Sequence, residues 1–187
     1  MTRLARFLLS CFLAGLLPSL AWAELTVGKP APAFSTKAAL CGEEITFTLS
    51  EALKNGPVVV YFYPTSLTSV CSVCAADAHL FAQAMAEFKK RGSSVIGISA
   101  DTSATQREFS RTACRDKFPV AADPKGKIIK AYEVVAWHED HRIYASWTSY
   151  VITPDGKIAS VLIAPDADSH IQSALTFVKA WKERQVR

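Results

Sequence analysis

Short apolar runs alternate with longer stripes of helical spacing along the chain. Residues 58–62 are all β-branched or aromatic, which is typical of a strand covered on both faces, and residues 95–99 predict a second buried strand. Between these runs, apolar residues recur at the spacing of one helix face: Ala78, Phe81, Met85 and Phe88. The order is strand, helix, strand, and strands that alternate with helices predict an α/β sheet with helices on both faces.

The rest of the chain continues this alternation. A helix is expected after residue 99, opened by Thr105 with Glu108 as its capping-box partner and running towards Cys114. The remaining expected elements are a strand around 45–47, a strand at 118–121, a helix at 127–132, a hairpin of 147–153 with 158–163, and a last helix beginning near Ser169. No repeat or linker divides them, so we predict one α/β domain over residues 24–187, with a central sheet flanked by helices.

The first 23 residues differ from the rest. Arg3 and Arg6 precede an apolar run at 7–20, and the small-x-small triplet Ala21-Trp22-Ala23 follows, which predicts a cleaved secretory signal peptide at 1–23. Export to the periplasm is expected, without stable membrane insertion after cleavage; an uncleaved anchor is the alternative. Cleavage would lower the net charge from +4 to +2, too little to indicate a nucleic-acid partner.

Cys71 and Cys74 stand where a buried strand has ended and an apolar-striped helix begins. The free amide N–H groups and the dipole at a helix start stabilise a thiolate, which is the nucleophilic form of cysteine. A CxxC pair at this place in a β-α-β order indicates a thioredoxin-like fold with a redox-active dithiol. A zinc half-site would need a second pair of ligands at fixed spacing, and the sequence has none, so no metal is expected.

The loop before these cysteines resembles the active-site motif of the peroxiredoxins. Pro64-x-x-x-Thr68-x-x-Cys71 follows a Tyr-Phe-Tyr strand, and the likeness runs from residues 30–34 to residues 149–158, best matching the single-domain bacterioferritin-comigratory branch. The resemblance implies that Cys71 attacks the peroxide, Thr68 hydrogen-bonds to it and Pro64 shields the site. A hydroxyl can both accept from and donate to a peroxide, and a proline ring excludes water without adding an N–H donor.

The implied reaction has two steps. Cys71 becomes a sulfenic acid on reducing hydrogen peroxide or an organic hydroperoxide, and Cys74 then condenses with it to a disulfide. A thioredoxin-like or other external dithiol must reduce that disulfide. No nucleotide, flavin or haem motif is present, so no cofactor is expected and the cysteines supply the electrons. The sequence leaves the oligomeric state open.

Two departures from the family pattern keep other functions open. Trp147 occupies the place of the usual peroxiredoxin arginine, two residues before Ser149, and Cys74 replaces a residue that is more often polar or acidic. The three nearby candidates to replace that arginine are interpreted as ordinary surface residues: Arg107, Arg111 and Arg142. The alternatives are a periplasmic thiol–disulfide oxidoreductase using the Cys71/Cys74 pair, and a non-catalytic redox-sensing domain.

Two further groups of residues are candidates for chemistry. Cys41 and Cys114 could pair with each other, act as alternative resolving thiols or stay free, because connectivity does not follow from spacing. The stretch His-Glu-Asp-His at 138–141 is similar to a metal-ligand cluster, but its polar surroundings favour a solvated turn.

Overall fold

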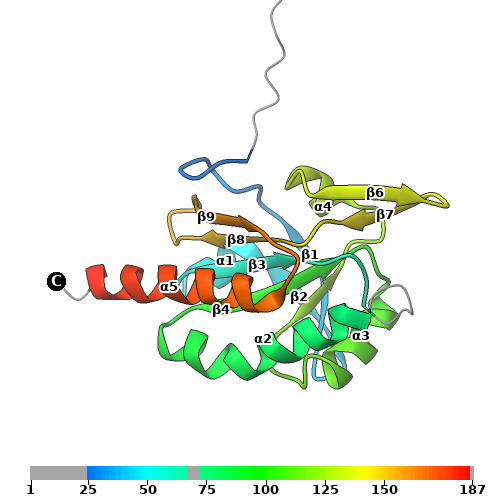
Figure 1. The fold of residues 1–187 in the computed structure, drawn as a ribbon, viewed down its shortest axis with the longest axis horizontal. Coiled ribbons are helices and arrows are strands. Elements are labelled where there is room, and N and C mark those ends of the chain that lie inside the picture. The colour runs from blue at the N-terminus through cyan, green and yellow to red at the C-terminus, as the bar shows by residue number, and fades with distance from the viewer. Residues whose placement is uncertain (1–24, 67–71, 186–187) are drawn as a thin grey trace, which may run out of the picture.

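The computed structural model of the chain describes residues 25–66 and 72–185. Within these ranges a seven-stranded sheet has the order β2-β1-β5-β4-β3-β8-β9, and β6 and β7 form a separate two-stranded ribbon (Figure 1). The predicted signal peptide at 1–23 lies outside the described residues. The α/β class with a central sheet flanked by helices is confirmed, and it is the thioredoxin-like arrangement expected from the sequence.

The centre of the sheet is parallel and its two sides are antiparallel. β4 pairs in parallel with β3 and with β5, whereas β1 with β2, β1 with β5, β3 with β8 and β8 with β9 are antiparallel. The strands are β1 (Ser35–Leu40), β2 (Glu43–Thr48), β3 (Val58–Phe62), β4 (Ser94–Ser99), β5 (Val120–Ala122), β6 (Val135–Glu139), β7 (Arg142–Ala145), β8 (Thr148–Ile152) and β9 (Ile158–Ile163). The parallel core places the ends of β3 and β4 side by side, so the loops that follow both strands meet.

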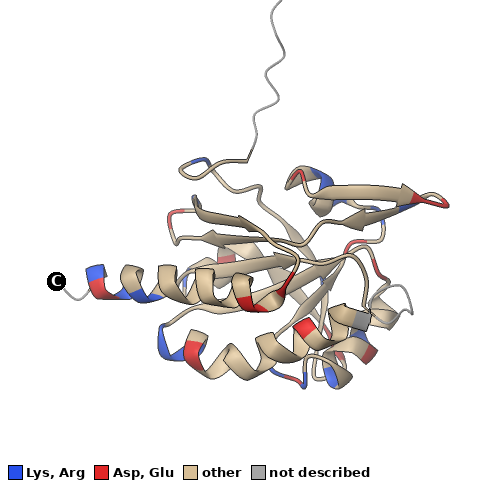
Figure 2. Cartoon of the chain, in the orientation of Figure 1, with Lys and Arg blue, Asp and Glu red and all other residues tan. Residues whose placement is uncertain are grey.

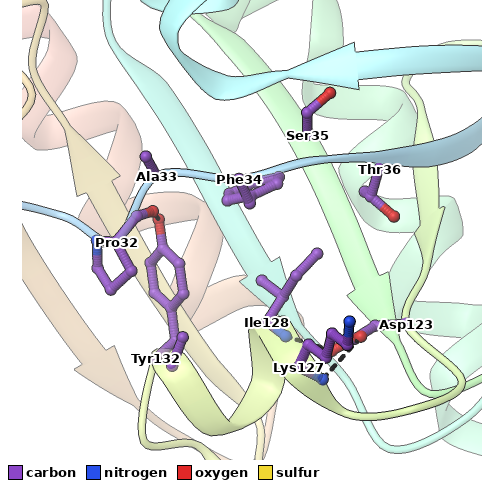
Figure 3. Close-up of a pocket in the computed structure, with 10 residues that line it drawn as sticks. Pro32, Ala33, Phe34, Ser35, Thr36, Asp123, Lys127, Ile128 and Tyr132 are labelled. Carbon is purple, nitrogen blue, oxygen red and sulfur yellow. Dashed lines mark hydrogen bonds between the residues drawn. The ribbon is translucent and has the colours of Figure 1, made fainter.

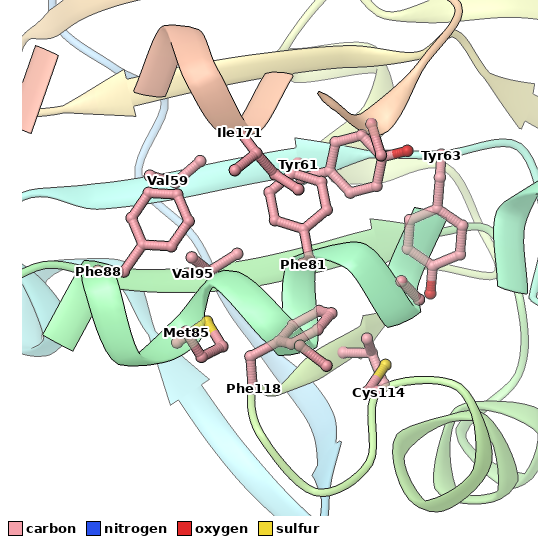
Figure 4. Packing of buried hydrophobic residues seen from close by; sticks show 14 of the residues in the cluster. Val59, Tyr61, Tyr63, Phe81, Met85, Phe88, Val95, Cys114, Phe118 and Ile171 are labelled. Carbon is pink, nitrogen blue, oxygen red and sulfur yellow. The ribbon is translucent and has the colours of Figure 1, made fainter. Parts of the chain in front are cut away.

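Helices cover both faces of this sheet. They are α1 (Leu49–Leu53), α2 (Ser72–Lys90), α3 (Ser103–Thr112), α4 (Lys127–Ala131) and α5 (Ala167–Gln185). The residues of β3 alternate between two apolar clusters: Val59 and Tyr61 pack with α2, α3 and α5, whereas Val60 and Phe62 pack on the opposite face with α1 and α4. Figure 4 shows the first cluster, with Phe81 of α2 and Ile171 of α5 against Tyr61. Burial on both faces explains the unbroken apolar run of β3.

The predicted starts of two helices lie two residues too late. α3 begins two residues before Thr105, because the side chain of Thr102 caps it by accepting from the Thr105 amide at 3.2 Å. α5 begins at Ala167, ahead of the expected start at Ser169, and the Asp166 carboxylate accepts from the Ser169 amide at 2.8 Å. In both cases a polar side chain just upstream satisfies a first-turn amide, which moves the helix start.

Charged residues lie mainly on turns and helix ends, as Figure 2 shows. Lys89 and Lys90 end α2, and Lys182 and Arg184 lie in the last turn of α5. The Lys182 ammonium donates to the Lys90 carbonyl oxygen at 2.7 Å, which ties these two helix ends together at the end of α2 opposite Cys74. Among the described residues, no helix is both long and apolar enough to span a membrane.

Candidate active site

The predicted site lies between the end of β3 and the start of α2. Thr68 and Cys71 fall outside the described residues, as does the rest of the segment 67–71, but α2 begins at Ser72, the residue after Cys71. Pro64 is buried in the described part of the loop, and Cys74, three residues into α2, is 2% exposed. Cys74 therefore lies in the first turn of a 19-residue helix, which follows Cys71 directly in sequence. The dipole of a helix stabilises a thiolate at its start.

Asp101 anchors the described part of this loop. It follows β4 by two residues and is 4% exposed, and its Oδ2 accepts from the Ser66 amide at 2.7 Å. Its Oδ1 accepts from the Thr65 hydroxyl at 3.1 Å, and the Ser99 hydroxyl donates to Oδ2 at 2.7 Å. Because an amide and a hydroxyl of adjacent loop residues both bond to one carboxylate, the backbone entering the cysteine segment is fixed to β4.

Gln106 of α3 extends this anchor on the other side of Ser66. Its amide oxygen accepts from the Tyr63 hydroxyl at 2.9 Å and from the Ser66 hydroxyl at 3.2 Å. Its amide nitrogen donates to the Ser99 hydroxyl at 2.8 Å and to the Ala121 carbonyl oxygen at 3.0 Å. Because the polar groups of this buried network are hydrogen-bonded to one another, a shift of the loop would leave some of them without partners. The network therefore stabilises one conformation of the loop.

Arg142 closes the network from β7. Its guanidinium forms an ion pair with Asp101, and Nη2 also donates to the Thr65 hydroxyl at 3.3 Å. The guanidinium lies 5.2 Å from the centre of the Tyr144 ring, and that ring stacks on Trp137 with centroids 4.8 Å apart. The interpretation of Arg142 as an ordinary surface residue is therefore wrong, because it joins the β6–β7 ribbon to the loop that leads to Cys71.

A second polar group lies beneath the first turns of α2. Asp77 is 4% exposed, and its Oδ2 accepts from the Tyr61 hydroxyl of β3 at 3.4 Å. Burial raises the pKa of the Asp77 carboxyl, and the hydrogen bonds from Tyr61 and from the Ala167 amide oppose part of this rise. Burial also raises the pKa of the Tyr61 phenol well above its usual range, so Tyr61 is the donor in this pair.

His170 of α5 adjoins this group. It is fully buried, its ring lies edge-on to Tyr61 with centroids 5.3 Å apart, and Nδ1 bonds with the Ser149 hydroxyl at 2.8 Å. Its Nε2 bonds with the Ala164 carbonyl oxygen at 3.0 Å. A carbonyl only accepts, so Nε2 carries the proton, Nδ1 accepts from Ser149, and burial lowers the pKa of this neutral imidazole.

Comparison with known proteins places this arrangement in a family. The sequence model of the AhpC/TSA family matches residues 27–161. The match includes the loop, the cysteine pair, Asp101, Asp77 and Ser149, and it ends before His170. The chain belongs to the AhpC/TSA family. This confirms the peroxiredoxin resemblance that the Pro64–Thr68–Cys71 motif indicated.

Its relatives bear peroxiredoxin names. A putative peroxiredoxin of Mycobacterium tuberculosis is 29% identical over 133 residues, which cover 71% of this chain and 84% of the relative. The chloroplastic peroxiredoxin Q of Populus jackii is 34% identical over 62% of this chain and 50% of its own length. The crystal structure of peroxidoxin BcpB from Mycobacterium tuberculosis matches with a TM-score of 0.74 and 26% identity, covering 83% of this chain and 97% of its own. The peroxiredoxin Q structure of Xylella fastidiosa shares the fold, with a TM-score of 0.71 and 20% identity over 83% of this chain and 96% of its own.

These findings identify a thiol-dependent peroxidase of the peroxiredoxin type and favour this activity over the thiol–disulfide oxidoreductase alternative. In this peroxiredoxin Trp147, in the usual arginine position, is half-buried against the cluster that contains Cys74. Its indole N–H is buried and near enough to the Tyr61 hydroxyl to lower the pKa of that phenol, but the geometry is not that of a hydrogen bond. Arg107 and Arg111 are exposed, as expected for surface residues.

The other two cysteines are free thiols, so they do not pair. Cys41 is exposed in the turn between β1 and β2, and its thiol points to the Asp116 carbonyl oxygen at 3.9 Å. Cys114 is fully buried at the end of α3, in the cluster of Figure 4, and burial raises the pKa of its thiol far above the ordinary value. A buried, protonated thiol is a poor nucleophile, so the structure gives Cys114 no support as a resolving cysteine.

Two further features lie apart from the cysteine site. A pocket of about 330 Å³ opens between the start of β1 and α4, on the opposite sheet face from Cys74 (Figure 3). Its Asp123 carboxylate accepts from the amides of Lys127, Ile128 and Ile129 and so caps α4. The His-Glu-Asp-His stretch at 138–141 forms the exposed tip of the β6–β7 ribbon. No group of three or more potential ligands that could hold a metal ion occurs in the described part of the chain.

Sequence reasoning missed Asp101, Gln106, Asp77 and His170. Asp101 had a readable signal, because it directly follows the strand beside β3, and loops after adjacent parallel strands meet. Asp77 also had one, since a residue three positions after Cys74 shares its helix face. The contacts of Gln106 and His170 had none, because they join residues 40 and 21 positions apart in sequence.

Proposed function

We propose that Cys71 is the thiol with which this peroxidase attacks hydrogen peroxide or an organic hydroperoxide, and that Cys74 resolves the product as a disulfide. The observation that carries the proposal is the first turn of α2. A strand and an anchored loop lead to Cys71, and Cys74 is buried one helical turn further on. Two cysteines at this spacing near a helix start can reach the separation of about 5.5 Å between Cα atoms that a disulfide requires.

In the first step the Cys71 thiolate attacks one peroxide oxygen. The S–O bond forms as the O–O bond breaks, hydroxide or alkoxide leaves and takes up a proton, and sulfur is oxidised to the sulfenic acid. Thr68 is proposed to accept from and donate to the peroxide oxygens, and the buried Pro64 to exclude water from the thiolate. Because Asp101 and Gln106 both hold Ser66, the segment carrying Thr68 and Cys71 starts from a fixed point.

In the second step the Cys74 sulfur attacks the sulfenic sulfur of Cys71. The S–S bond forms, the S–O bond breaks and water leaves. A thioredoxin-like dithiol then reduces the disulfide by thiol–disulfide exchange, which returns both thiols. Val73, between the two cysteines, is 49% exposed, so the reductant approaches the pair from the outer face of this helix turn.

Arg142 is the arginine that we assign to this site in place of the one that Trp147 displaces. Its charge is paired with Asp101, so it acts by fixing Thr65 and the loop rather than as a free cation beside the peroxide. This assignment distinguishes the chain from a pattern in which an arginine precedes the hydroxyl residue of the late strand.

We also propose export. The n-region arginines, apolar run and Ala21-Trp22-Ala23 triplet support removal of residues 1–23 and a periplasmic mature protein beginning at Glu24. Intact-mass analysis of protein purified from the periplasmic fraction tests this, with a mature chain starting at Glu24 as the expected result. A chain retaining residues 1–23 would contradict it.

Steady-state peroxide consumption by the mature protein, with a thioredoxin system as reductant, tests the residue roles. Cys71→Ser should lose all turnover, because no other described thiol replaces an activated thiolate at the helix start. Cys74→Ser should lose turnover with the dithiol reductant but still consume one equivalent of peroxide. Cys41→Ser, an exposed cysteine away from the helix, is the matched control and should keep wild-type turnover. Peroxide turnover retained by Cys71→Ser would reject the proposal.

A further inference from the structure

Asp77 is a buried carboxylate without a cationic partner among the described residues. It takes no part in the ion pairs of that part of the chain, and its contacts are the Tyr61 hydroxyl at 3.4 Å and the Ala167 amide. Placing a carboxylate in an apolar cluster without a cation costs stability. At Asp101 the ion pair with Arg142 and three hydrogen-bond donors offset this cost. Asp77 has no such ion pair among the described residues, which points to a functional reason for the carboxylate.

Asp77 and Cys74 share one face of α2. They are three residues apart, which puts their Cβ atoms about 5–6 Å from each other. Both are buried, at 4% and 2% exposure, so both face the sheet side of the helix. Side chains on a helix lean towards its N-terminus, which favours an approach of the Asp77 carboxylate to the turn that carries Cys74.

We propose that Asp77 is the proton acceptor of Cys74 in the resolving step, and again when the external dithiol reduces the disulfide. This rests on the proposed function, in which Cys74 is the resolving thiol. As the Cys74 sulfur attacks the sulfenic sulfur of Cys71, its S–H proton passes to the Asp77 carboxylate. The S–S bond forms, the S–O bond breaks, and the leaving hydroxide takes a proton from solvent and departs as water. On reduction, the protonated Asp77 returns its proton to the Cys74 thiolate as that thiolate leaves.

The surroundings of Asp77 suit this role. Burial and the nearby carboxylates of Asp166 and Asp168, beside the start of α5, raise the pKa of the Asp77 carboxyl towards that of a thiol, which makes proton exchange between them easier. Tyr61 faces it from β3 as a neutral donor, because the pKa of the phenol is raised. His170 faces Tyr61, but both of its ring nitrogens are taken up by Ser149 and Ala164, so it does not compete for the proton.

Single-turnover oxidation separates this step from the peroxide reaction. Reduced mature protein is mixed with excess hydrogen peroxide in a stopped-flow instrument, and quenched samples are analysed by mass for sulfenic acid and disulfide. In Asp77→Asn, sulfenic acid should form at the wild-type rate, whereas disulfide formation should slow by about 10- to 100-fold and lose its dependence on a carboxylate pKa. Glu183→Gln removes the same charge from an exposed residue near the other end of α5 and should leave disulfide formation within about twofold of wild type.

Tyr61→Phe supplies an independent test that keeps the carboxylate. The Tyr61 hydrogen bond lowers the pKa of Asp77, so its removal should raise the pH midpoint of disulfide formation. Wild-type rates and midpoints in Asp77→Asn and Tyr61→Phe would overturn the role of Asp77. A wild-type protein that forms no sulfenic acid, or a Cys74→Ser protein that still forms the same disulfide, would instead remove the proposed function.

Discussion

Two buried aspartates adjoin the described residues on either side of the cysteine segment, and their surroundings are opposite. Asp101 holds the loop residues that precede this segment: it accepts from a backbone amide and two hydroxyls and is paired with Arg142. Asp77, one turn beyond Cys74, accepts from one phenol at 3.4 Å and one amide. Both are 4% exposed, so burial does not distinguish them; the number of donors does.

This difference in donors assigns a structural role to the Asp101 carboxylate and a proton-transfer role to the Asp77 carboxylate. A carboxylate with several donors and a cationic partner fixes the groups around it, as Asp101 fixes Thr65 and Ser66. Burial raises the pKa of the Asp77 carboxyl, which has few donors, and Asp77 shares a helix face with the thiol whose proton must move. Asp123 also has a structural role, because it caps α4 through three amides; burial raises the pKa of its carboxyl, but it lies on the opposite sheet face from Cys74.

The largest effect is expected from Asp101→Asn. This change leaves Arg142 without its counter-charge and frees the loop, so the oxidation of Cys71 should slow by about 100-fold. The free energy of unfolding should fall by about 2–3 kcal/mol. Stopped-flow oxidation and urea unfolding measure the two quantities, with Asp168→Asn as the exposed control. An unchanged oxidation rate would show that Asp101 only stabilises the fold.

Arg142→Gln should have a smaller effect on stability. The Arg142 side chain is 36% exposed, so solvent screens part of its pairing with Asp101, and a loss of about 1–2 kcal/mol is expected. Arg142→Lys should recover part of that loss but not the contact with the Tyr144 ring. If Arg142→Gln oxidises as fast as wild type, Arg142 does not replace the family arginine.

Asp77→Asn should change the pH dependence of stability. A raised pKa in the folded protein means that folding favours the protonated carboxyl, so its contribution is complete below the ordinary value of 3.8 and is lost as pH rises through the folded pKa. The variant lacks this loss. Its free energy of unfolding relative to wild type should therefore increase from pH 4 to pH 7, as measured by urea titration at several pH values. A difference that is constant with pH would contradict the raised pKa.

Ser149→Ala should have the smallest effect. It removes the hydroxyl that donates to Nδ1 of His170, and a loss of about 1 kcal/mol in the free energy of unfolding is expected at pH 7.5. Because the described hydrogen bond of the Ser149 hydroxyl goes to His170 and not to the loop anchor, sulfenic acid formation should be unchanged. A slowed peroxide reaction would show that Ser149 of β8 also contributes to the reaction of Cys71 with peroxide.

Much of the fold follows from local sequence. The apolar runs that became β3 and β4, the turn between β8 and β9, and the stripe on α2 are set by burial and turn chemistry within a few residues. The starts of α3 and α5 were misplaced by two residues, because upstream side chains compete for the first-turn amides. The β6–β7 ribbon was missed, since its two strands pair only with each other and β6 is exposed along most of its length.

The candidate site was predictable only in part. Cys71, Cys74, Thr68 and Pro64 follow from spacing and the family motif, although no structural observation tests their roles. The role of Arg142 does not follow, because its partners Asp101 and Thr65 are 41 and 77 residues away in sequence and meet it only through the folded sheet. Long-range polar contacts of this kind depend on the complete topology.

The most direct test of the account is the mass of the Cys74→Ser protein after one turnover with hydrogen peroxide in the presence of a sulfenic-acid trap. The account predicts one trapped adduct per chain, located at Cys71 by peptide mapping, and no adduct at Cys41 or Cys114. A trapped adduct at either of those cysteines, or an unreacted Cys71, would contradict it.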